Sequence, residues 1–169
     1  MNQDELLPIV DENDIVIGSR TRKYVHENHL PHRGIHIFVV NFQGDILIQT
    51  RKTGRDYPGY YDSSVGAQVC FEETYEQAAL RETKEELGFI PEKLIEICRY
   101  KSFSERQKEF RTLFVCYHEG PFIFDRNEIE SIEFYSPDRI REAITKGEKF
   151  TEGSKISFSK YLEYSLKLK

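Results

Sequence analysis

The segment from Thr74 to Gly88 contains signals for both the start and the end of a helix. Thr74 and Gln77 form a Thr-x-x-Gln capping box, whose side chains satisfy backbone N–H groups of a first helical turn. Gly88 suits the left-handed conformation in which many helices end. The apolar residues between these ends can form one buried stripe, made of Ala78, Ala79, Leu80 and Leu87. The sequence therefore predicts a loop, a helix that begins just after Glu73, and a second loop.

Three glutamates of this predicted helix, Glu82, Glu85 and Glu86, lie on one side of it. Residues three and four apart are neighbours on a helix, and each like-charge pair costs about a few tenths of a kcal/mol unless a positive group separates the charges. Mg²⁺ or Mn²⁺ is such a group, because both ions bind carboxylate oxygens and share the rest of their coordination shell with phosphates. Acidic helix faces are more often only solvated, so the choice between a metal site and a solvated face depends on the surrounding sequence.

The surrounding residues, 64–90, read SVGAQVCFEETYEQAALRETKEELGFI. This run closely resembles the Nudix box: a glycine, five free positions, a glutamate, seven free positions, Arg-Glu, an apolar residue, one free position, Glu-Glu, one free position, a glycine and an apolar residue. In this chain the pattern falls on Ala67, Glu73, Arg81, Glu82, Thr83, Glu85, Glu86, Gly88 and Phe89. So many agreeing spacings make the resemblance far more specific than a lone glycine motif.

Two positions depart from the box pattern. Ala67 replaces the first glycine, which narrows the backbone options of a loop that approaches the substrate. Thr83 replaces an apolar residue and should weaken one core contact. Neither change removes a carboxylate.

The Nudix resemblance implies roles for the residues that match. Glu85 and Glu86 would be metal ligands, with Glu82 as a ligand or general base. Glu73 and Arg81 would brace the loop against the helix. The implied cofactor is Mg²⁺, with Mn²⁺ as an alternative.

Residues outside the box resemble the branch of the superfamily that contains isopentenyl diphosphate isomerase. Residues 10–14, 32–39 and 57–66 carry this resemblance, which extends from about Val10 to Ile140. In the isomerases a catalytic cysteine stands at the position of Gly66 and a metal-binding histidine at that of Gln68. Moving a double bond needs an acid and a base on opposite sides of a carbon, so these replacements predict that isomerase activity is lost.

A Glu-x-Glu pair of the isomerases aligns best with Gln107 and Glu109, so only one acid is kept. His26 and His32 resemble the remaining members of the isomerase metal cluster. Because their partners are missing, loop histidines or hydrogen-bonded ones near a sheet edge are the simpler expectation.

Length and composition limit the remaining possibilities. The 169 residues are enough for one sizeable domain, so we expect a single domain over 1–169. The net charge of -5 argues against a nucleic-acid partner, whereas a small phosphorylated substrate is compatible. The odd cysteine count does not suggest a disulfide framework. No apolar run approaches the roughly 20 residues of a membrane span, and the amino terminus lacks the basic start of a signal peptide. We therefore expect a cytoplasmic monomer or homodimer without a membrane partner.

Apolar runs and turn residues predict alternating strands and helices. The expected strands cover residues 7–10, 15–19, 35–41, 46–50, 94–103, 111–117 and 129–135, and the first two pairs are expected to be hairpins. A short helix is expected near 20–28, another from Ser136, and a last one between about Lys155 and Leu166. Its inward-facing residues should be Ile156, Tyr161, Leu162 and Leu166. The expected fold is α/β with a mixed sheet between helices, and the resemblance implies the Nudix-type α/β/α sandwich.

Further residues could contact a substrate. Arg51, Lys52 and Arg55 follow a predicted strand and could grip phosphates, although basic residues in a turn are as often only solvated. Glu109 and Glu128 are weaker candidates for an extra ligand or a base. Four aromatic residues near the box could stack on a base or, more commonly, pack in the core: Tyr57, Tyr60, Tyr61 and Phe71.

The sequence thus predicts a Mg²⁺-dependent Nudix hydrolase that cleaves a diphosphate linkage in a nucleoside diphosphate derivative. Two alternatives stay open: isopentenyl diphosphate isomerase and a non-catalytic nucleotide-binding Nudix domain. Gly66 and Gln68 argue against the first, and three intact acids argue against the second.

Overall fold

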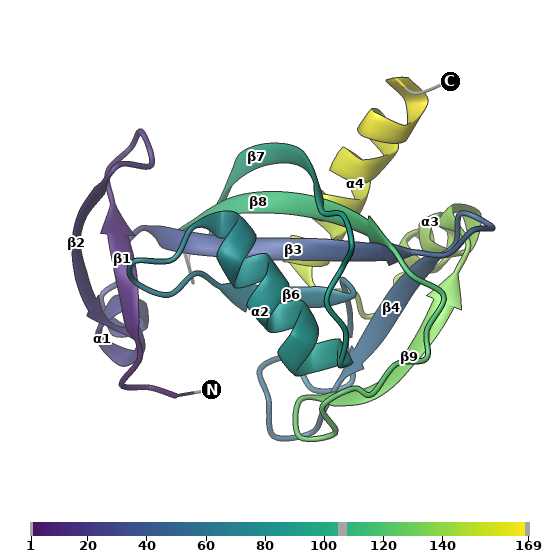
Figure 1. Ribbon diagram of the computed structural model, residues 1–169, viewed down its shortest axis with the longest axis horizontal. Coiled ribbons are helices and arrows are strands. Elements are labelled where there is room, and N and C mark those ends of the chain that lie inside the picture. The colour runs from purple at the N-terminus through teal and green to yellow at the C-terminus, as the bar shows by residue number, and fades with distance from the viewer. Residues whose placement is uncertain (1, 105–107, 168–169) are drawn as a thin grey trace.

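The computed structural model describes residues 2–104 and 108–167 (Figure 1). The strands in chain order are β1 (Leu6–Val10), β2 (Val16–Thr21), β3 (His32–Val40), β4 (Ile46–Arg51), β5 (Tyr61–Asp62), β6 (Val65–Gln68), β7 (Ile95–Phe103), β8 (Lys108–Tyr117) and β9 (Ile129–Tyr135). The helices are α1 (Arg22–Glu27), α2 (Tyr75–Leu87), α3 (Pro137–Thr145) and α4 (Glu152–Lys167). Every expected element is present, whereas β5 and β6 were not expected. Gln107 lies outside the described residues.

Strand β3 is the centre of the main sheet. It pairs in parallel with β8 over its whole length, from His32 to Val40. Its other edge pairs antiparallel with β6 at residues 34–37 and meets β4 only where Val40 lies opposite Ile46. The continuous hairpin expected for β3 and β4 is therefore not formed, because β6 occupies that edge and β4 pairs with β5 and β9 instead.

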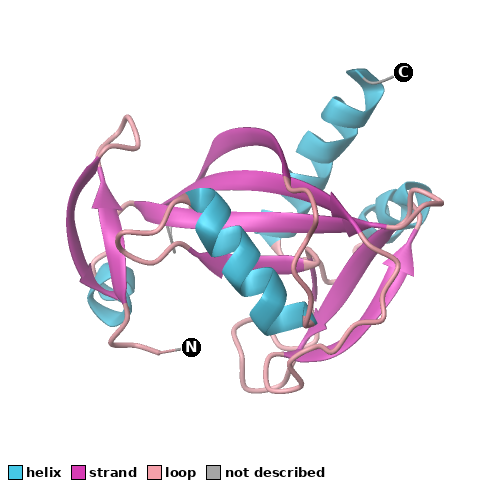
Figure 2. Ribbon diagram, viewed as in Figure 1, coloured by secondary structure: helices cyan, strands magenta, loops and turns pink. Residues whose placement is uncertain are grey.

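Both faces of β3 are buried, which places a helical layer on each side of the sheet. Ile35, Ile37 and Val39 belong to the core that α2 covers, whereas Phe38 and Val40 belong to the core that α3 and α4 cover. Figure 2 shows α2 crossing in front of the sheet, with α3 and α4 on the other side. This arrangement confirms the α/β/α sandwich with a mixed sheet.

The box helix, α2, has the predicted ends. The Thr74 side chain accepts from the Gln77 N–H, the Gln77 side chain accepts from the Thr74 N–H, and Gly88 closes the helix at φ 80°. Thr83, the polar residue at an apolar box position, is fully buried. Its hydroxyl donates to the Ala79 carbonyl at 2.7 Å, so this departure leaves no unsatisfied group.

Helix α4 packs against the core through Tyr161 and Leu162, as expected, but not through the other two expected residues. Ile156 is 38% exposed and Leu166 is 71% exposed, whereas Ser157 is fully buried. The Ser157 hydroxyl lies 2.7 Å from Nδ1 of His36 and 2.6 Å from the Tyr100 hydroxyl. A polar network therefore sets the orientation of the helix, which an apolar pattern does not reveal.

Residues 2–29 contain a separate hairpin and helix, made of β1, β2 and α1, at one end of the main sheet (Figure 1). Strands β1 and β2 pair as the predicted hairpin. Backbone hydrogen bonds fix this unit to the rest of the chain: Phe71 N–H donates to the Leu6 carbonyl at 2.8 Å, and Val10 N–H donates to the Pro31 carbonyl at 3.0 Å. Among the described helices, none has the length and apolar character needed to cross a membrane.

Candidate active site

A cavity of about 170 Å³ lies beside the glutamates of α2. Its acidic lining residues are Glu5, Glu82, Glu85, Glu86 and Glu128. Its basic lining residues are Arg22, Arg51, Arg55 and Arg81. The other lining residues are Asn2, Gln49, Gly66, Ala67 and Gln68. The structure thus brings the predicted acids together with two of the three predicted substrate-binding cations.

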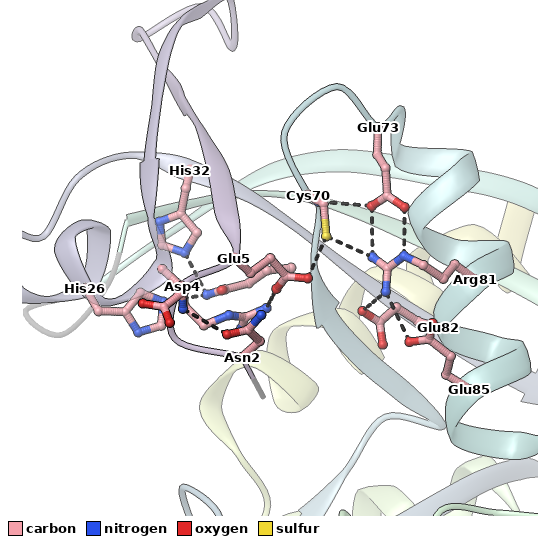
Figure 3. A network of polar contacts seen from close by, with 12 residues as sticks. Asn2, Asp4, Glu5, His26, His32, Cys70, Glu73, Arg81, Glu82 and Glu85 are labelled. Atoms are coloured by element: carbon pink, nitrogen blue, oxygen red, sulfur yellow. Dashed lines mark hydrogen bonds and ion pairs between the residues drawn. The ribbon is translucent and has the colours of Figure 1, made fainter.

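Arg81 joins the loop before α2 to the helix itself (Figure 3). Its Nε and Nη2 donate to the two carboxylate oxygens of Glu73, at 2.7 and 2.8 Å. Its Nη1 donates to Glu82 at 2.6 Å and to Glu85 at 3.3 Å. Glu73 also accepts from the Cys70 N–H at 3.0 Å. These contacts hold the loop and the acidic helix face in one arrangement.

Glu82 and Glu86 sit where a negative charge is unfavourable. Burial raises the pKa of Glu86 well above its ordinary value, and the charges of Glu82, Glu128 and Asp62 raise it further. Burial also raises the pKa of Glu82, although Arg81 partly opposes this. The amide of Gln49, on β4, approaches Glu86 at 3.5 Å. Crowded, partly desolvated carboxylates of this kind favour a bound cation.

The donor chemistry of these acids fits a hard divalent ion, which prefers oxygen ligands. Within residues 2–104 and 108–167, however, no three His, Cys, Asp or Glu side chains converge closely enough to form a ready-made metal cage. Arg81 occupies the space between Glu82 and Glu85, while Glu86 faces Gln49. Binding a cation would therefore require these side chains to rearrange.

The three predicted cations have different positions. Nη1 of Arg51 lies 2.8 Å from Asp62, and Nη2 of Arg55 lies 2.7 Å from Glu128, and both arginines line the cavity. Lys52 is not a lining residue; its ammonium group lies 3.2 Å from Glu130.

Glu109 is placed away from the cavity, unlike Glu128. It is buried on β8, where it forms an ion pair with Arg111 and lies 3.4 Å from Nε2 of His32. The amide nitrogen of Gln68 lies 2.6 Å from Nε2 of His26 and 3.0 Å from Nε2 of His32. Both histidines are thus hydrogen-bonded, which agrees with the simpler of the two expectations for them.

The sequence did not indicate four residues of the cavity wall. Gln49 could have been suspected, because it is a polar residue on the same face of a buried strand as Leu47. Asn2, Glu5 and Arg22 gave no such indication, because no local pattern reveals that the first hairpin folds back against the box loop.

Comparison with known proteins gives consistent matches. The family model described as the NUDIX domain matches residues 30–153. An uncharacterised Nudix hydrolase of Yersinia pestis is 31% identical over 159 residues, which cover 94% of this chain and 86% of that protein. The uncharacterised Nudix hydrolase YfcD of Escherichia coli strain K12 is 30% identical over 137 residues, which cover 80% of this chain and 76% of that protein.

Solved structures agree with these matches. DR0079 from Deinococcus radiodurans superposes with a TM-score of 0.81 at 26% identity, covering 93% of this chain and 99% of that one. A MutT Nudix hydrolase from Burkholderia pseudomallei has the same fold, with a TM-score of 0.65 at 20% identity, covering 77% of this chain and 97% of that one. Nudix hydrolases generally use divalent metal ions. The chain belongs to the Nudix hydrolase family and is a pyrophosphohydrolase enzyme.

Proposed function

We propose that this enzyme is a Mg²⁺-dependent hydrolase of a diphosphate linkage in a nucleoside diphosphate derivative. The observation that carries the proposal is the composition of one cavity wall, in which the three box glutamates of α2 share the space with four arginines. Carboxylates suit the metal and guanidinium groups suit phosphate oxygens, so the wall has a partner for each charged component of such a substrate.

Glu85 and Glu86 would hold the metal. When bound, the metal supplies charge neutralisation at the phosphate oxygens and at the leaving oxygen. Burial raises the pKa of Glu82, which favours a role as the base that accepts a proton from the attacking water, in place of a role as metal ligand. Arg51 and Arg55 would orient the phosphates, and Glu73 would hold Arg81 against the helix.

The composition of the same wall argues against isopentenyl diphosphate as the substrate. Gly66 provides no thiol, and none of the lining residues among those described carries a large apolar side chain that could cover an isoprenoid chain. The amide of Gln68 is already bonded to two histidines. Positions 66 and 68 therefore supply neither the catalytic thiol nor the histidine ligand of the isomerases.

The test is a panel of nucleoside diphosphates, nucleoside triphosphates, dinucleotides and nucleotide sugars, incubated with Mg²⁺ or with a chelator. Product analysis then identifies which bond was cut. We expect cleavage between phosphates that stops with chelator and falls at least about 100-fold in Glu86→Gln.

Glu76→Gln is the matched control, because Glu76 lies exposed in the first turn of the same helix. Equal rates for Glu86→Gln and the unmodified enzyme would contradict the catalytic assignment. Migration of a double bond in isopentenyl diphosphate would contradict the choice of hydrolysis.

A further inference from the structure

Part of the cavity wall comes from outside the residues that match the family model. Asn2, Glu5 and Arg22 belong to the first hairpin unit, whereas the match begins at residue 30. Two backbone hydrogen bonds hold this unit in place, from Phe71 N–H to the Leu6 carbonyl at 2.8 Å and from Val10 N–H to the Pro31 carbonyl at 3.0 Å. The hairpin unit is therefore fixed in place as part of the cavity wall.

Glu5 and Arg22 form a charged pair in this wall. Nη2 of Arg22 lies 2.5 Å from Oε2 of Glu5, and the Arg22 side chain is only 6% exposed. Burial alone would raise the pKa of Glu5, but hydrogen bonds from Arg22 and Cys70 and the charges of Arg22 and Arg81 lower it. The Glu5 side chain is 29% exposed, so the pair buries the arginine while its carboxylate stays open to the cavity. Burying a charged guanidinium group is costly, and stability alone is a weak explanation for it.

The pair is linked to the catalytic helix through one side chain, Cys70 (Figure 3). The Cys70 thiol donates to Oε1 of Glu5 at 3.0 Å and accepts from Nη2 of Arg81 at 3.4 Å. Arg81 in turn contacts Glu82 at 2.6 Å. Because Glu5, Arg22 and Glu82 line the same cavity, a molecule whose diphosphate lies at Glu82 can place a neighbouring group against Glu5 and Arg22.

The described part of the cavity wall has no aromatic ring on which a base could stack. Tyr61 instead packs in the core against Tyr135 and Phe150, and Tyr57 packs against Tyr60. The wall is instead made almost entirely of charged and amide side chains, which favours recognition of a polar group through hydrogen bonds.

We propose that Glu5 and Arg22 recognise the hydroxyl groups of a sugar attached directly to the diphosphate, and that the base, if there is one, stays outside the cavity. This inference rests on the proposed hydrolase function. A carboxylate accepts from hydroxyl groups and a guanidinium group donates to them, so the pair can bind two neighbouring hydroxyls at once. The substrate class is thus a sugar diphosphate derivative, and its sugar is either the ribose of a nucleoside or a sugar on the far phosphate.

Matched substrate pairs test the inference and show whether the recognised sugar is the ribose of the nucleoside or the sugar on the far phosphate. ADP against 2′,3′-dideoxy-ADP removes the ribose hydroxyls, and UDP-glucose against UDP-2-deoxyglucose removes one from the far sugar. We expect kcat/KM to fall about tenfold or more within at least one pair, as for the loss of a charge-assisted hydrogen bond. The discrimination ratio is kcat/KM for the hydroxylated substrate divided by kcat/KM for its deoxy partner. In Glu5→Gln and Arg22→Lys this ratio should approach one.

Control variants separate recognition from folding. Arg20→Lys changes an exposed arginine of the same hairpin, outside the cavity, and should keep the unmodified ratio. If a variant of the buried pair fails to fold, Asn2→Ala tests the same wall at an exposed position. A ratio in the variants equal to that of the unmodified enzyme, or no discrimination within either pair, would overturn the inference.

A binding measurement makes the inference independent of turnover. In metal-free protein, the NMR signal of the Arg22 side-chain Nε–H should shift when ribose 5-phosphate is added and stay unchanged with inorganic phosphate. If the unmodified enzyme hydrolyses nothing in the panel, the proposed function fails, and this titration still decides. A selective shift supports the sugar subsite, whereas equal shifts or none overturn it.

Discussion

Glu73 and Arg81 are joined by two parallel hydrogen bonds of 2.7 and 2.8 Å, which fasten the loop before α2 to the helix. The hydrogen bonds from Arg81 lower the pKa of Glu73 below its ordinary value. Lysine keeps the positive charge but has one nitrogen in place of a planar fork, so Arg81→Lys should lose this geometry. We expect kcat/KM for diphosphate hydrolysis to fall about 10- to 100-fold.

The control for Arg81→Lys is Arg99→Lys. Arg99 forms a similar fork with Glu96, at 2.9 and 3.0 Å, but on the exposed surface of β7. If both variants lose activity equally, the effect of Arg81 is not specific to the box loop.

Glu128 and Glu109 should respond differently to loss of charge. Glu128→Gln, in the cavity, is expected to lower kcat about 10- to 100-fold with little change in stability. Glu109→Gln leaves the charge of Arg111 buried without its carboxylate, and should cost about 3–5 kcal/mol of unfolding free energy. Steady-state kinetics and urea denaturation measure the two effects, with Glu130→Gln as the exposed control.

His32 should make the enzyme less stable in mild acid. Burial lowers the pKa of His32 to about 4, helped by the charges of Arg111 and Arg22. The neutral ring is fully satisfied, because Nδ1 donates to the Leu30 carbonyl at 2.8 Å and Nε2 accepts from Gln68. The unfolded chain binds the proton more readily, so this stabilisation is complete above pH 6.5 and is lost as the pH falls towards 4.

The difference in pKa corresponds to about 3 kcal/mol of unfolding free energy over that range. Urea denaturation at about pH 5 and pH 7.5 should therefore give a smaller difference for His32→Asn than for the unmodified protein. His29→Asn, at an exposed histidine with φ 51°, is the control, since asparagine tolerates this conformation. An unchanged pH slope in His32→Asn would show that other groups account for the acid sensitivity.

Gly88→Ala should destabilise the protein through both backbone strain and contact. Gly88 has φ 80°, and an added Cβ would lie 2.7 Å from the Ile123 carbonyl oxygen. Ile123 N–H donates to the Leu87 carbonyl at 3.1 Å, so the clash falls on the segment that leads to Glu128. We expect a loss of about 2–4 kcal/mol in thermal or urea unfolding, together with reduced activity.

Gly44→Ala isolates the strain component. Gly44 has φ 88°, but an added Cβ would meet nothing within 4 Å. This variant should lose about 1 kcal/mol and keep full activity. Equal losses in the two variants would mean that contact with Ile123 contributes nothing.

Local signals made the box helix predictable. The Thr74 and Gln77 cap, the glycine at Gly88 and the periodic apolar residues all act within a few residues of one another, and the structure has them as expected. The strand pairing was less accessible, because the partner of β3 along its whole length, β8, lies far away in the sequence. The turn between β3 and β4, which contains Gly44 and Asp45, suggested a hairpin. In the structure these two strands pair only at Val40 and Ile46.

The residues that line the cavity were predictable only where they belong to the Nudix box. Glu82, Glu85 and Glu86 followed from fixed spacings, whereas the choice of Glu128 over Glu109 depended on which loop reaches the site. Lys52 and Arg51 are adjacent in sequence, yet only Arg51 lines the cavity, because successive residues of an extended chain point in opposite directions. The inward face of α4 was predicted correctly for Tyr161 and Leu162, whereas Ser157 was missed because it is buried through hydrogen bonds.

The hairpin before residue 30 has a consequence for how this enzyme could diversify. It meets the catalytic helix through the hydrogen bond from Tyr75 to Asp14 and through Cys70, which links Glu5 to Arg81. Neither contact includes Glu82, Glu85 or Glu86, so the rest of the hairpin can change in sequence without altering the geometry of these acids. Relatives with identical boxes but different leading hairpins would then act on different metabolites. Grouping such enzymes by their boxes alone would merge distinct specificities, and exchanging hairpins between them offers a direct route to retargeting.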